Sequence, residues 1–146
     1  MDTFYTSHSD SYDVKNVFIS LGINDIRRLQ HCVLFLRRHL VNLIDKIKRY
    51  FGSSCNIYFQ SVLPTEIENR HTVRNILDVT KLLYIICAQN NCFYIDAFSH
   101  FLDAKGMYIN RALYKDRVHF NHKVIALLAS NYIYLINNKK FNPHVF

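Results

Sequence analysis

Apolar residues along this chain fall into short continuous runs, typical of strands, and longer periodic runs, typical of helices. The segment NVFISLGINDIRRL, residues 16–29, contains the start of both. Residues 17–21 read as apolar on both faces, as in a strand of a parallel sheet that is covered on two sides. From residue 25 to residue 51, apolar positions recur at steps of three and four, which predicts a long amphipathic helix. A Gly-x-Asn-Asp turn joins the two elements, and its composition calls for an explanation.

The same patterns predict the rest of the chain. They give a strand at 57–64 (IYFQSVLP), a helix at 72–89, a strand at 92–96 (CFYID) and a closing helix at 121–136, with Asn121 as its N-cap. Strands that alternate with helices predict right-handed crossovers and a parallel sheet between two helical layers. We therefore expect a three-layer α/β sandwich at residues 15–137, preceded by a polar segment at 1–14 and followed by a tail at 138–146.

The composition is that of a globular protein. Half of the 146 residues are hydrophobic, and the chain has only three Gly and two Pro. Eighteen Lys and Arg against eleven Asp and Glu leave a net charge of +7, which favours encounters with phosphates, anionic membrane surfaces or acidic partners. The charge biases encounters but identifies no function.

Four cysteines, at positions 32, 55, 87 and 92, lie in or beside apolar segments and form no Cys-x-x-Cys pair. We interpret them as reduced, buried thiols. The alternative, a zinc site built from Cys87, Cys92 and a distant His, has no recognisable ligand spacing. The amino-terminal residues resemble no signal peptide, and no apolar run approaches the roughly 20 residues of a membrane helix. We expect no transmembrane segment and an intracellular, cytoplasmic location.

The Gly-x-Asn-Asp turn is the first candidate site, because sites in open parallel sheets form in loops at the carboxyl ends of strands. Gly22 permits backbone angles that a side chain would forbid and allows a substrate to approach closely. The side-chain amide of Asn24 could donate a hydrogen bond to a developing oxyanion. The alternative is that Asn24 or Asp25 only caps the following helix, because both residue types are favoured at that position.

The second candidate is the segment YKDRVHFNHKVIALLA, in which Asp116 and His119 lie three residues apart, just before the last helix. On a turn, this spacing lets the carboxylate bind imidazole Nδ1 and leaves Nε2 free as a general base. The alternative is an ordinary loop Asp beside a surface or half-buried His. His119 and His122 also form an H-x-x-H pair, but no suitably spaced third ligand accompanies it.

The order of these segments resembles the carboxy-terminal part of the SGNH hydrolases, also called the GDSL esterase and lipase superfamily. The resemblance covers residues 15–135 and rests on VFISLGINDI, IYFQSVLP, FYID and DRVHFNHKVIALLA, with helices between the first three. It implies a flavodoxin-like sheet that lacks its first strand or strands. It also implies that Asn24, in the turn with Gly22, is the oxyanion residue, and that Asp116 and His119 are the acid and base of a Ser-His-Asp triad.

The sequence departs from that family at the nucleophile. Family members carry a Gly-Asp-Ser block, and then a block whose Gly donates to the oxyanion, before the Gly-x-Asn strand, and neither is visible here. Sixteen residues precede Val17, too few for a strand, a crossover helix and another strand. The letters SDSYD include Ser11, but no apolar strand leads into it. Ser61 lies inside a predicted strand, where we expect its hydroxyl to bind a backbone group. The nucleophile is unknown.

Two hypotheses about function remain. The first is an SGNH-type hydrolase-like protein for small carboxylic esters, inactive as this chain because acyl-enzyme chemistry cannot start without a nucleophile. The alternative is a non-catalytic interaction module, from a mobile-element protein, that binds a protein partner or nucleic acid. The basic face of the long helix supports nucleic acid only weakly. We expect no cofactor and no metal. We also expect self-association through the open edge of strand 17–21.

Overall fold

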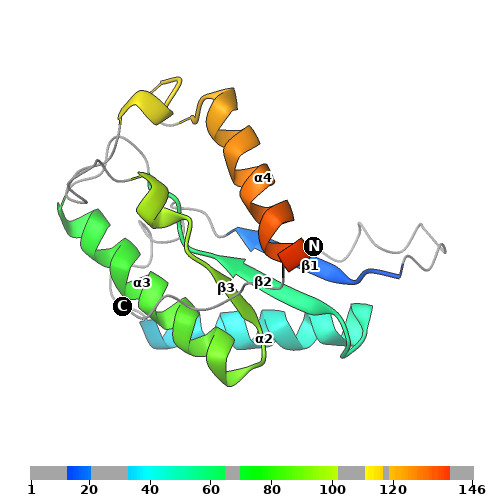
Figure 1. Ribbon diagram of the computed structural model, residues 1–146. Coiled ribbons are helices and arrows are strands. Elements are labelled where there is room, and N and C mark those ends of the chain that lie inside the picture. The colour runs from blue at the N-terminus through cyan, green and yellow to red at the C-terminus, as the bar shows by residue number, and fades with distance from the viewer. Residues whose placement is uncertain (1–12, 21–32, 65–69, 102–110, 117–118, 139–146) are drawn as a thin grey trace.

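The computed structural model describes residues 13–20, 33–64, 70–101, 111–116 and 119–138. Three strands form one parallel sheet in the order β1-β2-β3, and helices alternate with them along the chain (Figure 1). The elements are β1 (Asn16–Ser20), α2 (Val33–Phe51), β2 (Asn56–Gln60), α3 (Arg70–Gln89), β3 (Phe93–Ile95), the 3-10 turns η1 (Phe98–Phe101) and η2 (Arg111–Leu113), and α4 (His122–Asn138). The expected α/β class with a parallel sheet is confirmed.

Helices α2 and α3 cover one face of the sheet, and the main core lies between them and the strands (Figure 1). Strand β2 contributes Ile57 and Phe59, which are fully buried, and β3 contributes Tyr94. The helices contribute apolar residues at the spacing of one helix face, among them Leu40, Ile44, Ile76, Leu83 and Ile86. The periodic positions that predicted two amphipathic helices are therefore the positions that build the core.

Helix α4 lies on the opposite face of the sheet, which completes the three layers (Figure 1). On this face an aromatic row crosses all three strands. Phe18 stacks on Tyr58 with ring centroids 4.6 Å apart, and Tyr58 stacks on Phe93 at 4.9 Å. The three residues are direct register partners in the sheet. Tyr132 of α4 stacks on Phe18 at 5.8 Å, so α4 contacts the sheet through this row.

Strand β1 is at the edge of the described sheet, with a neighbouring strand on the β2 side. Its apolar sequence predicts a strand buried on both faces, but its residues alternate between exposed and partly buried. Phe18 keeps 41% of its surface exposed, whereas Tyr58, its neighbour on β2, keeps 4%. The difference follows from position, because within the described sheet β2 has a strand on each side and β1 has one.

Several boundaries differ from the sequence prediction. The apolar run predicts a strand through Pro64, but β2 ends at Gln60, which pairs with the last residue of β3, so no described strand continues beside it. Helix α3 begins at Arg70 rather than 72, and β3 is one residue shorter at each end. Of the predicted helix at 25–51, residues 25–32 lie outside the described residues. Asn121 caps α4 as expected, since its Oδ1 accepts the Val124 N–H at 3.1 Å.

None of the helices in the described residues is both long and apolar enough to span a bilayer.

Two leucines on the helices provide a matched test of this core. Leu83 on α3 is fully buried, whereas Leu34 on α2 is 81% exposed. We expect Leu83→Ala to lower the free energy of unfolding by about 2–5 kcal/mol, because it removes buried methyl groups and leaves a cavity. Leu34→Ala should change it by less than about 0.5 kcal/mol. Denaturant unfolding monitored by far-UV circular dichroism measures both, and equal effects would contradict this core.

Candidate functional site

The predicted Asp-x-x-His segment forms a short loop that is closed on itself just before α4. Tyr114 and Phe120 form an antiparallel bridge, and the Lys115 N–H donates to the His119 carbonyl at 2.8 Å. The side-chain amide of Asn121 donates to the Ala112 carbonyl at 2.9 Å, which ties the start of α4 to η2. These bonds fix the two ends of the loop that carries the candidate residues.

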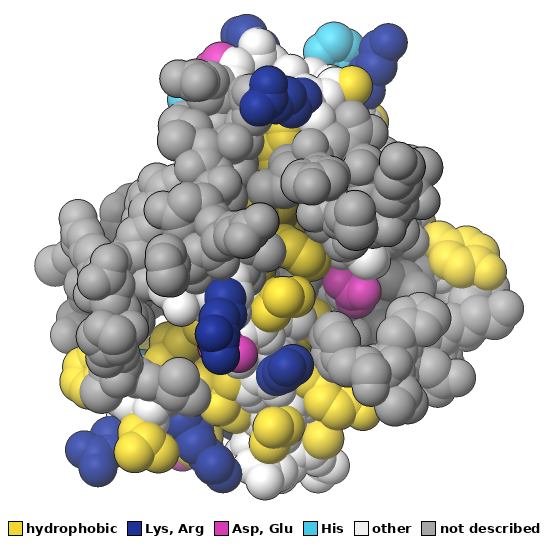
Figure 2. Space-filling view, turned by 90° about the vertical axis from the view of Figure 1, so that its left-hand side faces the viewer, with side chains coloured by type: hydrophobic (Ala, Val, Ile, Leu, Met, Phe, Trp, Pro, Cys, Tyr) yellow, Lys and Arg dark blue, Asp and Glu magenta, His cyan; other side chains and the backbone are white. Residues whose placement is uncertain are grey.

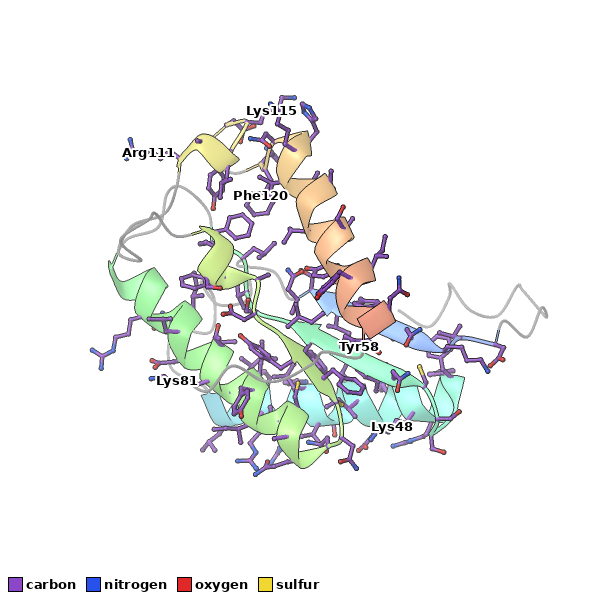
Figure 3. The ribbon with its side chains drawn as sticks, viewed as in Figure 1. Lys48, Tyr58, Lys81, Arg111, Lys115 and Phe120 are labelled. Carbon is purple, nitrogen blue, oxygen red and sulfur yellow. The ribbon has the colours of Figure 1, made fainter. Side chains whose placement is uncertain are left out.

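An aromatic cluster attaches this loop to the carboxyl end of the sheet. The rings of Phe101, Tyr114 and Phe120 lie with centroids 4.9 to 6.2 Å apart. Phe101 is almost fully buried and belongs to the turn η1, just after β3. The Tyr114 hydroxyl donates to the Pro64 carbonyl at 2.7 Å, close after the end of β2. In Figure 3 the Phe120 side chain points inward among these elements, and Lys115 points outward above α4.

Asp116 and His119 are in direct contact. Nδ1 of His119 lies 2.9 Å from Oδ2 and 3.1 Å from Oδ1 of Asp116. The backbone N–H of His119 donates to the same Oδ1 at 2.8 Å. The carboxylate therefore holds both the ring and the backbone of the residue three positions later. The hydrogen bond that the sequence spacing predicts is present.

This arrangement has a definite chemical capacity. A carboxylate on Nδ1 favours the tautomer with a proton there and leaves Nε2 unprotonated, as a general base requires. Both side chains are exposed, His119 to 76% and Asp116 to 54%, so water screens their attraction. The backbone bond is also that of an ordinary Asp-initiated turn. The geometry permits the catalytic role, and it permits the simple loop role equally.

Ser61 lies directly after β2, one residue beyond the strand in which the sequence prediction placed it. Its side chain is fully buried at the carboxyl end of β2. Its Oγ accepts the backbone N–H groups of Ala97 at 2.9 Å and Phe98 at 2.8 Å. The expectation that this hydroxyl binds backbone groups is confirmed. A hydroxyl held in this way links the ends of β2 and β3 and is closed to solvent.

The other candidate residues, Gly22, Asn24 and Ser11, lie outside the described residues. The described position nearest to Gly22 and Asn24 in the sequence is Ser20, the last residue of β1, whose Oγ accepts a hydrogen bond from the Gln60 side chain at 3.1 Å. Because β1 and β2 are parallel, the chain leaves β1 at the same end of the sheet at which Tyr114 holds the loop to Pro64. The oxyanion role of Asn24 stays a prediction.

The described cysteines are free thiols with local hydrogen bonds. The Cys87 thiol donates to the Phe93 carbonyl at 3.6 Å. Burial, with a smaller contribution from Cys92, raises the Cys87 pKa to about 12, so this thiol is protonated at neutral pH. Within the part of the chain that the structure describes, no group of three or more His, Cys, Asp and Glu side chains could hold a metal ion.

Two of the basic residues on the predicted helix face form hydrogen bonds within the molecule. Lys48 donates to the Asn90 carbonyl at 2.9 Å, and Arg37 donates to the Gln89 side-chain oxygen at 2.9 Å, so both bind the end of α3. Carbonyl groups at a helix carboxyl end have no partner within the helix, which makes them natural acceptors for Lys. On the face in Figure 2, Lys and Arg side chains lie in several separate places with hydrophobic side chains between them.

Three solved structures are similar to this chain. A protein from Bacteroides fragilis that carries the name "putative acylhydrolase" has a TM-score of 0.66 at 18% identity, and the match covers 88% of this chain and 63% of that one. A catalytic mutant of Axe2, an acetylxylan esterase from Geobacillus stearothermophilus, has a TM-score of 0.65 at 19% identity and covers 85% and 60%. A second Axe2 mutant, named as an acetyl-xylooligosaccharide esterase, has a TM-score of 0.64 at 19% identity and covers 84% and 59%.

The fold is of the SGNH-hydrolase type. No protein-family model and no curated protein sequence matches the chain, so the likeness lies in the structure. The chain spans about three fifths of the length of these hydrolases. The expected partial SGNH-type architecture is confirmed to that extent, whereas identities below one fifth leave the site residues untested.

Sequence reasoning missed the residues that hold the site in place. Tyr114 binds Pro64 across fifty positions, and Phe101 reaches Phe120 from another element. A signal was present in the aromatic residues on both sides of the Asp-x-x-His motif, since Tyr114 lies two residues before it and Phe120 directly follows it. Such a flanking pair is typical of a loop closed by its own bridge, but no pattern in the sequence identifies the partners.

Ser61 allows a test of the scaffold beneath the site. We expect Ser61→Ala to lower the free energy of unfolding by about 1–3 kcal/mol for each buried N–H that it leaves without an acceptor. The control is Ser53→Ala in the exposed turn after α2, which should change stability by less than about 0.5 kcal/mol. Denaturant unfolding of both variants checks this. Equal stability of the two variants would contradict the bonds from Ala97 and Phe98.

Proposed function

We propose that this protein is an SGNH-type, hydrolase-like protein whose site is built for carboxylic esters, and that it is inactive as this chain. The observation that carries the proposal is the Asp116–His119 hydrogen bond on a loop attached to the carboxyl end of a parallel sheet. Support also comes from the fold, which the chain shares with an acetylxylan esterase over part of that enzyme's length. We place the domain at residues 15–137.

In this proposal each residue has one role. Asp116 orients His119 and stabilises its protonated form, and Nε2 of His119 takes a proton from an attacking hydroxyl. Asn24 donates its side-chain N–H to the oxyanion, with Gly22 giving the substrate room. The attacking hydroxyl is the part that we propose to be absent, because Ser61 is buried and bound to the backbone and no apolar strand leads into Ser11. Without it, no acyl-enzyme forms.

A short nitrophenyl ester tests this proposal. We expect the wild-type chain and His119→Ala to hydrolyse it at the same rate, equal to that of an unrelated protein at the same concentration, because no nucleophile is present to use the base. Far-UV circular dichroism verifies that both are folded. A wild-type rate that exceeds this background and falls to it in His119→Ala would show that the chain is active. Ser11→Ala would then identify or exclude Ser11.

The protonation of His119 tests the dyad independently of turnover. We expect nitrogen NMR of neutral His119 to show the proton on Nδ1, because both carboxylate oxygens of Asp116 lie within hydrogen-bonding distance of that atom. In Asp116→Ala the proton should move to Nε2 in most molecules, since the acceptor is lost. A wild-type ring with its proton on Nε2 would contradict the role of Asp116.

A second candidate function is a non-catalytic interaction module, from a mobile-element protein. The partly exposed strand β1 and its edge favour it. A protein partner fits the observations better than nucleic acid, because Lys48 and Arg37 bind the end of α3. We also propose a reducing, intracellular environment, in keeping with the free thiols of Cys55, Cys87 and Cys92.

A further inference from the structure

We propose that Cys87 and Cys92 are a modification site at which the chain forms an intramolecular disulfide. Both thiols are free in this structure. Cys87 lies in the last turn of α3, and Cys92 directly precedes β3. The disulfide therefore links the end of a helix to the start of the next strand by covalent bonds in addition to packing.

The way in which α3 ends brings the two residues together. The backbone N–H of Cys92 donates to the Cys87 carbonyl at 3.0 Å, and Asn91, just before Cys92, has a left-handed backbone with φ 54°. A bond from the sixth residue to the first, preceded by a left-handed residue, is a feature of the Schellman motif, in which the two end side chains are frequently in contact. Cys92 packs against the core cluster to which Cys87 belongs. The helix end therefore places the two thiols next to each other.

The backbone separation fits a disulfide. A 3.0 Å hydrogen bond between the backbones of Cys87 and Cys92 keeps their Cα atoms within about 7 Å of each other. Residues that are hydrogen-bonded in this way in antiparallel strands have Cα atoms about 5.5 Å apart, and disulfides bridge Cα separations of about 4.4–6.8 Å. Closure of the bond therefore needs rotation of the two side chains rather than a movement of the backbone.

Cys92 is the thiol that reacts first. It is partly exposed, whereas Cys87 is 2% exposed. The Lys48 ammonium donates to the Asn90 carbonyl at 2.9 Å, and the Cys92 thiol donates to the same oxygen at 3.6 Å. Burial raises the pKa of Cys92, and the charge of Lys48 opposes that rise, because a nearby cation favours the thiolate. Cys87 has no such cation among the causes of its raised pKa and is the resolving thiol.

The reaction is a thiol–disulfide exchange with a small disulfide, of which oxidised glutathione is the probe. The Cys92 thiolate attacks one sulfur of glutathione disulfide, whose S–S bond breaks and releases one glutathione thiolate. Cys87 then loses its proton and attacks the Cys92 sulfur of the mixed disulfide, which releases the second glutathione. The protein loses two electrons and two protons, and one oxidised glutathione becomes two reduced ones. Raised thiol pKa values make the reaction slow at neutral pH, so the end point is what is measured.

The experiment incubates the full, folded chain with oxidised glutathione to equilibrium, and then alkylates the remaining thiols in denaturant. Both cysteines are in the tryptic peptide 82–105. We expect this peptide to be about 2 Da lighter than its reduced form and to carry no alkyl group, whereas the untreated chain gives it two. Cys55→Ala, which removes a buried thiol elsewhere, should leave this result unchanged. A wild-type peptide that still carries two alkyl groups, or two glutathiones, overturns the proposal, and this measurement needs no variant.

Two matched variants test the order of attack. In Cys87→Ala the chain has no resolving thiol, so Cys92 should retain one glutathione as a mixed disulfide. In Cys92→Ala the buried Cys87 should take up at least about tenfold less glutathione over the same time. Far-UV circular dichroism verifies that both variants are folded. Equal glutathione on the two cysteines, or more on Cys87 than on Cys92, overturns the assigned order.

Discussion

The central strand β2 must be buried on both faces, and the rest of the architecture depends on this constraint. Ile57 and Phe59 face α2 and α3, whereas Tyr58 lies in the aromatic row beneath α4. A strand with two buried faces needs a helical layer on each side and a strand along each edge. The order of the chain provides them, because α2 and α3 are the two crossovers that bring β1, β2 and β3 together in parallel. The polar residues at the carboxyl end of β2 then define where the loops meet.

At the carboxyl end of β2, hydrogen bonds join segments that are far apart in the sequence, and these bonds have a structural role. Ser61 accepts two N–H groups from the turn after β3, and Pro64 offers its carbonyl to Tyr114. These contacts bring the segment before α4 to the sheet, although none of the three described strands contains it. The Asp116–His119 pair depends on them, because a contact between two exposed side chains contributes little to its own position. These structural contacts therefore account for the shape of the loop without any reference to catalysis.

The sequence predicts the strands and helices well because hydrophobic period is a local property. The spacing of Leu40, Ile44 and Ile47 indicates one helix face without knowledge of the fold. The Asp116–His119 bond is equally local, three residues apart. By contrast, the Tyr114–Pro64 bond joins residues fifty positions apart, and the burial of Phe18 depends on which strands stand beside β1. Such features are set by tertiary neighbours, which hydrophobic patterning does not specify.

The aromatic row across the sheet also gives this protein an intrinsic circular dichroism signal in the near ultraviolet. The chain has no Trp and ten Tyr, and Tyr58 and Tyr132 stack in fixed orientations with Phe18 and Phe93. Rings held in an asymmetric, rigid environment give the near-ultraviolet circular dichroism that is lost when side-chain packing loosens but secondary structure persists. Because Tyr132 of α4 is part of this row, the tyrosine band of that spectrum responds to the docking of one helix. The seating of α4 on the sheet can thus be followed in solution without any label.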